Sequence, residues 1–209
     1  MGQISVDVKV LGMVRTNCYL LNNDEINECV LIDAADNADE LIRMVEAHGS
    51  KLKAVLLTHG HFDHILAAKE VCERCGVKLY ASLQEQEVLE SPVINLSENY
   101  GMNVSIKADE TLSDGQILNL AGMDIKVLLT PGHTKGGVCY YVESENILFS
   151  GDTLFAESVG ITDFPTGSMS MIVRSIKDKI MVLPDNTRVY PGHGEGTSVG
   201  YERINNPFL

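Results

Sequence analysis

The sequence predicts an α/β fold in which helices cover the outer faces of two mostly antiparallel sheets. Apolar runs rich in β-branched residues alternate along the chain with helical patterns, and each half contributes several strands and one or two long helices. No stretch rich in Gly, Ser and Pro separates the two halves. We therefore expect residues 1–209 to form a single domain in which the sheets and helices bury their apolar faces together.

Ten segments have the apolar, β-branched composition of strands. They span residues 4–11, 18–21, 29–32, 54–57, 78–81, 116–120, 125–129, 137–142, 147–149 and 188–190. The dipeptide Ala121-Gly122 separates two of these segments, which predicts a hairpin turn between them.

Helical patterns occupy three longer segments and one short one. Residues 38–48 align Leu41, Val45 and His48 on one face, and residues 168–182 align Met169, Val173, Ile176 and Ile180. Residues 63–75 align Ile65, Ala68, Cys72 and Cys75. Ser82 and Glu85 have the spacing of a capping box, which predicts a short helix ending at residue 90. Residues 91–107 show no clear period.

The composition is that of an ordinary soluble globular protein, with 44% hydrophobic and 22% charged residues. Lysine and arginine number 16 against 29 acidic residues, so the formal net charge is −13. A surface this acidic repels phosphate backbones and anionic lipids. We therefore expect a small-molecule partner, and neither nucleic acid nor membrane.

The N-terminal residues and the cysteines predict a cytoplasmic location. Residues 1–9 lack the basic start and apolar core of a signal peptide, and no apolar run approaches the roughly 20 residues of a membrane helix. The five cysteines are an odd number without the spacing of a disulfide framework. Cys72 and Cys75 form a CxxC, which allows a redox or zinc role, but we favour two small core residues on one helix face.

Five of the six histidines lie in glycine-bearing turns that directly follow apolar strands. The sixth, His48, precedes Gly49 at a helix end, where a partial positive charge suits the helix dipole, so we give it no site role. The densest turn has the sequence THGHFDH at residues 58–64. Burying three imidazoles and a carboxylate without strong partners is costly, and a bound cation would serve as the partner of all four. This turn predicts metal ligands at His59, His61, Asp63 and His64.

Three further turns supply more candidate ligands at strand ends. Their sequences are Thr130-Pro131-Gly132-His133, Ser150-Gly151-Asp152-Thr153 and Tyr190-Pro191-Gly192-His193. Proline and glycine fix a sharp turn that aims the next side chain outward. We expect His133, Asp152 and His193 to meet the first cluster at one edge of the sheets, and the carboxylate of Asp152 can bridge two cations.

The order of these residues resembles the metallo-β-lactamase superfamily, in its glyoxalase II (hydroxyacylglutathione hydrolase-like) branch. The family pattern is a THxHxDH loop followed by a His, a bridging Asp and a final His. This chain matches it at residues 58–64, His133, Asp152 and His193. The segments 16–19, 31–33 and 151–155 are also similar to the family, so the resemblance covers nearly the whole length. It implies a four-layer αββα sandwich, in agreement with the strand and helix patterns.

The resemblance also implies how the ligands divide. His59, His61 and His133 would hold one metal, Asp63, His64 and His193 would hold the other, and Asp152 would bridge them. We expect two divalent ions, zinc first, with iron and manganese as alternatives because mixed His and carboxylate ligands suit all three. The expected reaction is attack of a metal-bridging hydroxide on a thioester or ester carbonyl. Asp63 is the candidate catalytic residue that orients the hydroxide, and Thr58 and Thr134 are candidate hydrogen-bond partners of the imidazoles or simple turn residues.

The substrate is less narrowly defined by the resemblance. Relatives commonly carry Gly-Arg-Thr-Asp where this chain has Gly160-Ile161-Thr162-Asp163. An arginine there could pair with a carboxylate of glutathione, whereas Ile161 cannot, so a smaller or more apolar acyl thioester, or a lactone, fits as well. The zinc β-lactamases of the superfamily are expected to lack the bridging Asp. Two alternatives stay open: a persulfide dioxygenase with one iron held by two His and one Asp, and a metal-binding module without catalysis.

Overall fold

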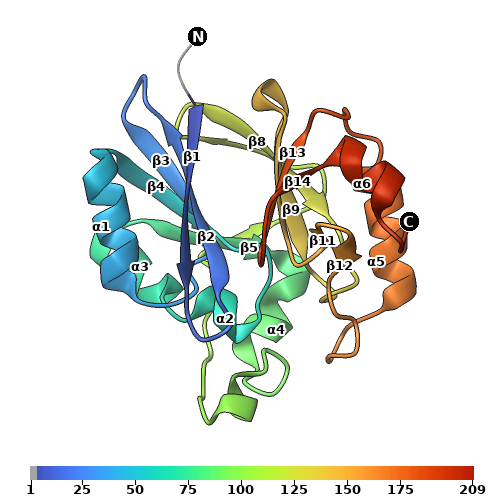
Figure 1. Ribbon diagram of the computed structural model, residues 1–209. Helices are drawn as coiled ribbons and strands as arrows, with labels where there is room; N and C mark the ends of the chain where they lie inside the picture. The colour runs from blue at the N-terminus through green and yellow to red at the C-terminus, as the bar shows by residue number, and fades with distance from the viewer. Residues whose placement is uncertain (1–3) are drawn as a thin grey trace.

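The computed structural model describes residues 4–209 and arranges them as a four-layer αββα sandwich (Figure 1). Two six-stranded sheets face each other in the middle. Helices α1 (Ala38–His48) and α3 (Ala68–Cys75) cover the outer face of the first sheet, while α5 (Met169–Ser175) and α6 (Val199–Asn205) lie on the opposite side of the molecule. The predicted fold class is confirmed. Residues 1–3, part of the stretch that lacks a signal-peptide pattern, lie outside the described residues, and a single domain over residues 1–209 stays a prediction.

The first sheet has an antiparallel half and a parallel half, in the strand order β1-β2-β3-β4-β5-β6. Its antiparallel strands are β1 (Ile4–Leu11), β2 (Thr16–Asn23) and β3 (Glu28–Ile32). The parallel additions are β4 (Lys51–Leu56), β5 (Lys78–Ser82) and β6 (Glu110–Leu112). Parallel neighbours need long crossover connections, which contain α1 between β3 and β4, α3 between β4 and β5, and residues 83–109 between β5 and β6. The expectation of a mostly antiparallel arrangement is therefore wrong for this sheet.

The second sheet follows the order β14-β13-β10-β9-β8-β7. Its strands are β7 (Ile117–Leu120), β8 (Met123–Leu129), β9 (Val138–Val142), β10 (Ile147–Gly151), β13 (Arg188–Pro191) and β14 (Thr197–Ser198). Its described pairings are antiparallel except that of β10 with β13. Ala121 and Gly122 form the predicted hairpin turn, with positive φ at both residues as a tight antiparallel turn requires.

Two predicted helices are interrupted. The pattern over 63–75 divides into α2 (Phe62–Ile65) and α3, because the chain turns at residues 66–67. The pattern over 168–182 becomes α5 followed by the π-helical turn η4 (Ile176–Ile180). Its buried face contains Ile172, whereas Met169 is 45% exposed and does not belong to it. The missed elements are short ones without a readable period: β6, β14, α6 and the hairpin of β11 (Leu154–Phe155) with β12 (Ser158–Val159).

The capping-box pattern at Ser82 is only half realised. The Ser82 hydroxyl accepts a hydrogen bond from the Gln84 amide and starts the 3₁₀ turn η1 (Leu83–Glu85), which leads into α4 (Gln86–Glu90). Glu85 does not return to Ser82, because its carboxylate is buried and bonded elsewhere. The remaining 3₁₀ turns are η2 (Ser97–Tyr100), within the segment that lacks a period, and η3 (Glu143–Glu145).

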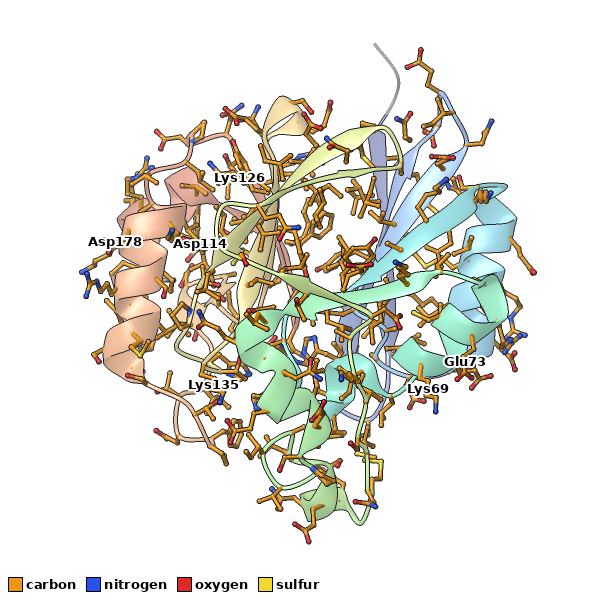
Figure 2. All side chains as sticks on the ribbon, turned by 180° about the vertical axis from the view of Figure 1, so that it is seen from behind. Lys69, Glu73, Asp114, Lys126, Lys135 and Asp178 are labelled. Carbon is orange, nitrogen blue, oxygen red and sulfur yellow. The ribbon has the colours of Figure 1, made fainter. Side chains whose placement is uncertain are left out.

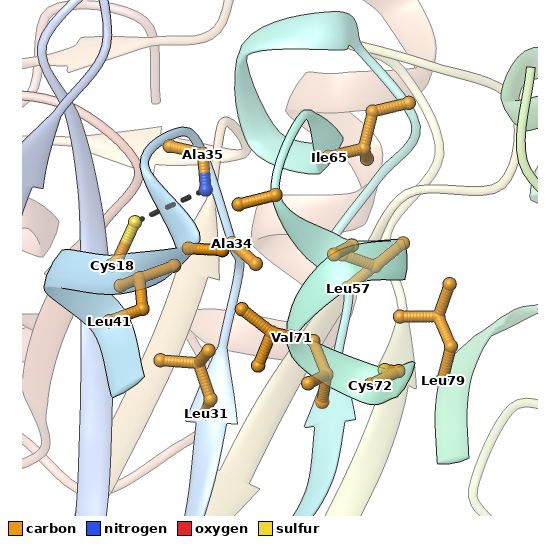
Figure 3. Close-up of a cluster of buried hydrophobic side chains, with 14 of the residues drawn as sticks. Cys18, Leu31, Ala34, Ala35, Leu41, Leu57, Ile65, Val71, Cys72 and Leu79 are labelled. Carbon is orange, nitrogen blue, oxygen red and sulfur yellow. Dashed lines mark hydrogen bonds between the residues drawn. The ribbon is translucent and has the colours of Figure 1, made fainter. Parts of the chain in front are cut away.

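Three apolar clusters correspond to the three interfaces between the layers. One lies between the first sheet and helices α1 and α3, a second between the sheets, and a third between the second sheet and the α5–η4 segment. Figure 3 shows part of the first cluster, where the Cys18 thiol accepts a hydrogen bond from the Ala35 amide. Cys72 belongs to this cluster and Cys75 packs against it, as free thiols, which matches the core interpretation of the CxxC. None of the described helices is long and apolar enough to cross a bilayer.

Candidate metal centre

The seven residues predicted as ligands come together from four segments, each of which follows a strand of one of the two sheets. The segment after β4 carries His59 and His61 in its loop and Asp63 and His64 in the short helix α2, and the loops after β8, β10 and β13 carry His133, Asp152 and His193. The side chains form overlapping groups whose ligand atoms lie within 4.8 Å of one another. Segments more than 100 residues apart therefore meet at one place, as the strand-end positions predict.

The first group consists of His59, His61 and His133. All three are at most 5% exposed. Nδ1 of His61 lies 2.8 Å from Nε2 of His133, and the ring of His59 packs edge-on against both. Three imidazoles therefore converge at a site that solvent hardly reaches.

The second group consists of Asp63, His64 and His193. Nε2 of His193 lies 3.3 Å from Oδ2 of Asp63 and 3.4 Å from Nε2 of His64. The side chain of His193 is 26% exposed, whereas His64 is fully buried. This group therefore forms the side of the site that faces solvent.

Asp152 lies between the two groups. Its Oδ2 atom is 3.5 Å from Nε2 of His133 in the first group and 3.4 Å from Nε2 of His193 in the second. Its Oδ1 atom is 3.4 Å from Nε2 of His64. One carboxylate thus reaches imidazoles of both groups, which is the arrangement expected of a bridging ligand.

Hydrogen bonds outside the cluster fix which nitrogen of several imidazoles faces inward. His64 uses Nδ1 to bond the Asp33 carboxylate at 2.8 Å, and His133 uses Nδ1 to bond the carbonyl of Ile161 at 2.6 Å. The Nδ1 atom of His59 lies 3.1 Å from the Thr58 hydroxyl, which itself donates to Asp33. In each case Nε2 is left for the site, and such outer partners fix the tautomer and orientation of ligating histidines.

The sequence interpretation missed several of these supporting residues. Asp33 directly follows the buried strand β3, as the candidate ligands follow theirs, but the sequence singles it out only as part of a family-like segment. Thr16 donates to Oδ2 of Asp63 at 2.8 Å, and Tyr19 donates to the carbonyl of Pro191 beside the His193 loop. Of the two roles left open for each threonine, Thr58 has that of an imidazole partner, whereas the Thr134 hydroxyl bonds the buried Glu85 and not an imidazole.

Burial and charge divide the histidines into two electrostatic classes. Burial holds the pKa of His59 well below its ordinary value and lowers the pKa of His61 to about 3, so both are neutral with a free lone pair at pH 7. Burial also lowers the pKa of His133. In the second group burial is outweighed by hydrogen bonds to Asp152 and Asp63, which raise the pKa of His193 to about 9. In the second group, His193 is therefore protonated at pH 7 beside these two carboxylates.

Unpaired buried atoms test whether this donor set fits metal ions. Nε2 of His59 and Oδ1 of Asp152 are buried and have no hydrogen-bond partner among residues 4–209, although Nε2 of His64 lies 3.4 Å from that oxygen. A buried polar atom without a partner is costly, and a cation would pair with both atoms. Neutral imidazoles with carboxylates suit zinc, iron and manganese. The residues therefore fit a pair of divalent cations.

Comparison with known proteins agrees with this geometry. The family model of the metallo-beta-lactamase superfamily matches residues 11–193. A hydroxyacylglutathione hydrolase of Haemophilus influenzae is 32% identical, and the match covers 99% of this chain and 98% of that protein. Among solved structures, the BLEG-1 B3 metallo-beta-lactamase is 38% identical with a TM-score of 0.93, covering 98% of this chain and 99% of that one. TTHA1623 in a di-iron-bound form is 34% identical with a TM-score of 0.86, covering 97% and 100%. The chain belongs to the metallo-β-lactamase superfamily.

Proposed function

We propose that this protein is a hydrolase that holds two divalent cations and cleaves acyl thioesters or esters. The observation that carries the proposal is the position of Asp152, whose carboxylate reaches imidazoles of both ligand groups. His59, His61 and His133 would hold one cation, and Asp63, His64 and His193 the other. Zinc is the proposed metal. The likeness to a di-iron-bound protein makes iron the principal alternative.

The side chains around the cations have separate tasks in this proposal. Bound cations would lower the pKa of a water molecule toward about 7 and so provide a nucleophile at neutral pH. Asp63 is only 11% exposed, and Thr16 already donates to its Oδ2 atom, so Oδ1 is the atom left to accept a hydrogen bond from that water and orient it. The second group is more exposed than the first, so an acyl group would enter from the His193 side.

The choice of thioester rests on the hydroxyacylglutathione hydrolase among the relatives. Two apolar side chains border the site: Phe164, whose ring lies edge-on to that of His61, and Ile161, which is 57% exposed and bonds His133 through its carbonyl. Neither can pair with a substrate carboxylate. We therefore propose an acyl thioester with a small or apolar acyl group, with lactones and simple esters as alternatives.

Two other reactions remain candidates. The BLEG-1 relative is named as a B3 metallo-beta-lactamase, so hydrolysis of a β-lactam amide is a second candidate for the same centre. A persulfide dioxygenase would use one iron held by two His and one Asp, and the second ligand group would then have no metal to bind. A non-catalytic metal module is the third outcome, although the full ligand set argues against it.

A substrate panel combined with metal analysis tests the proposal. The panel contains S-lactoylglutathione, an apolar acyl thioester, an ester, a lactone and a β-lactam. We expect close to two metals per chain, turnover of a thioester, and loss of at least one metal in Asp152→Ala. A single iron with oxygen uptake on a persulfide would replace the hydrolase by the dioxygenase, and wild type without metal after expression with metal supplied would end the proposal.

The location and the partner class belong to the same proposal. All five cysteines are free thiols, which supports a reducing compartment such as the cytoplasm. The net charge of −13 supports a small-molecule substrate over nucleic acid or anionic lipid.

A further inference from the structure

A buried carboxylate outside the ligand set lies next to the first ligand group. Glu85 ends η1 just before α4 and is 1% exposed. It does not belong to any of the ligand groups formed by the described residues, and the proposed reaction does not use it. Charged side chains are almost never fully buried unless they are paired, so its contacts need an explanation.

The two oxygens of Glu85 bind two different loops. Oε1 accepts the amide hydrogen of Gly60 at 2.9 Å, and Oε2 accepts the hydroxyl hydrogen of Thr134 at 3.0 Å. Gly60 lies between His59 and His61, and Thr134 follows His133. One carboxylate therefore joins the two loops that carry all three imidazoles of the first group.

The backbone around Glu85 packs closely against both loops. A Cβ atom at Gly60 would approach the Leu89 amide of α4 to 3.1 Å. A Cβ atom at Gly136, in the His133 loop, would collide with the backbone of Gln84 and Glu85. The two loops thus approach the η1–α4 segment at glycines, where a side chain would keep them away. This close approach brings the Glu85 carboxylate within hydrogen-bond distance of both.

We propose that Glu85 is a positioning residue for the first metal: it fixes the His59–His61 loop against the His133 loop, and so sets how closely the inward nitrogens of His61 and His133 approach. This inference rests on the proposed metal centre and concerns one of its two cations. It is distinct from the role of Asp33, which bonds the second group directly through His64. Loss of Glu85 should therefore weaken one metal selectively.

Zinc titration followed by imidazole ¹⁵N NMR separates the two metals in solution. In wild type we expect both groups of histidines to respond as Zn²⁺ is added to the metal-free protein. In Glu85→Ala the signals of His59, His61 and His133 should respond at a 10- to 100-fold higher free Zn²⁺ concentration, the range for lost outer partners. Those of His64 and His193 should be unchanged.

Milder variants keep the test decisive if Glu85→Ala does not fold. Glu85→Gln retains an oxygen that can accept the Gly60 amide, so its loss of zinc affinity should be smaller than that of the alanine variant. Thr134→Val removes the hydroxyl from the His133 loop at nearly constant volume, whereas Thr134→Ser keeps the hydroxyl and loses only a methyl group. We expect the valine variant to weaken the first metal and the serine variant to behave as wild type.

Two control variants separate positioning from general stability. Glu202 is also a fully buried carboxylate, and it accepts the backbone amide of Glu157 and the side-chain amide of Asn206 away from the metal centre. Glu202→Gln should lower the melting temperature without changing the zinc titration. Lys135, labelled in Figure 2, pairs at the surface with Glu87 of α4 and so lies between the His133 loop and that helix. Lys135→Gln removes an exposed ion pair of little energetic value, so it should leave both metals unchanged.

The outcomes distinguish this inference from the proposed function. Wild type that binds two zinc ions, together with Glu85 variants of unchanged affinity at both sites, would overturn the positioning role alone. Equal weakening of both metals would overturn it too, because a general loss of structure would then explain the effect. Wild type whose histidines never respond to zinc would overturn the metal centre and the role of Glu85 with it.

Discussion

His64 and Asp33 share a 2.8 Å hydrogen bond in which a fully buried imidazole donates to a carboxylate at the end of β3. The same carboxylate accepts both the amide and the hydroxyl hydrogen of Thr58, and that hydroxyl lies 3.1 Å from Nδ1 of His59. Asp33 therefore contacts one ligand of the second group directly and one ligand of the first group through Thr58.

Replacement of Asp33 by asparagine should weaken both metals. The single oxygen of an asparagine side chain cannot accept all three hydrogen bonds, so His64 loses the charged acceptor that fixes its tautomer, and Thr58 loses its anchor. We expect a loss of metal affinity of about 10- to 100-fold at both groups, measured by competition titration with a chromophoric chelator. Asp39→Asn, at an exposed side chain that pairs with Arg74, is the matched control and should bind metal as wild type. Unchanged affinity in the Asp33→Asn variant would contradict this role.

Gly192 and Gly194 should respond very differently to alanine. A Cβ atom at Gly192 would collide with Oδ1 of Asp152 and approach the His64 ring to 2.8 Å, whereas at Gly194 it meets no atom within 4 Å. Gly192→Ala should therefore displace the bridging carboxylate and lower the metal content below two per chain. Gly194 has φ +74°, a left-handed conformation that costs alanine about 1–2 kcal/mol, so its alanine variant should lose about that much stability but keep its metals. Metal analysis and denaturant unfolding check both, and equal metal content in the two variants would contradict the prediction.

The sequence predicted which candidate ligands come together better than it predicted the residues that hold them in place. His133, Asp152 and His193 could be proposed because each follows a proline- or glycine-containing turn at a strand end, a pattern that adjacent residues display. Asp33 and Glu85 act through contacts 25 to 49 residues away in the chain, which no local pattern reveals. Glu85 even carried a misleading local signal, because its spacing from Ser82 fits a capping box. The mixed first sheet was missed for a related reason, since strand direction depends on crossovers and not on strand composition.

The stability of the metal-free protein should depend on pH through Glu85. Burial, the largest influence, raises the pKa of this carboxyl from 4.5 to about 7. The folded state then binds a proton that the unfolded state has lost, so the contribution of Glu85 to stability is greatest below pH 4.5 and is lost as the pH rises toward 7. Glu85→Gln cannot titrate at this position. The free energy of unfolding of wild type, taken relative to that of this variant, should therefore fall by up to about 3 kcal/mol from about pH 5 to about pH 8. Urea unfolding at several pH values measures it, and a difference that does not vary with pH would show that the carboxyl titrates normally.

The side chain at position 161 should control whether a carboxylate-bearing thioester is used. Ile161 is held beside the site because its carbonyl accepts the bond from His133, and its side chain is 57% exposed. Ile161→Arg would place a cation there without changing that backbone bond. An exposed ion pair contributes about 0.2–1 kcal/mol, so kcat/KM for S-lactoylglutathione should rise by about 1.4- to fivefold through a lower KM. The gain should shrink at high salt, because salt screens exposed charges. Ile161→Gln, polar but uncharged, is the control and should show neither effect, while an arginine variant whose kcat/KM matches that of the glutamine variant would remove position 161 from the substrate site.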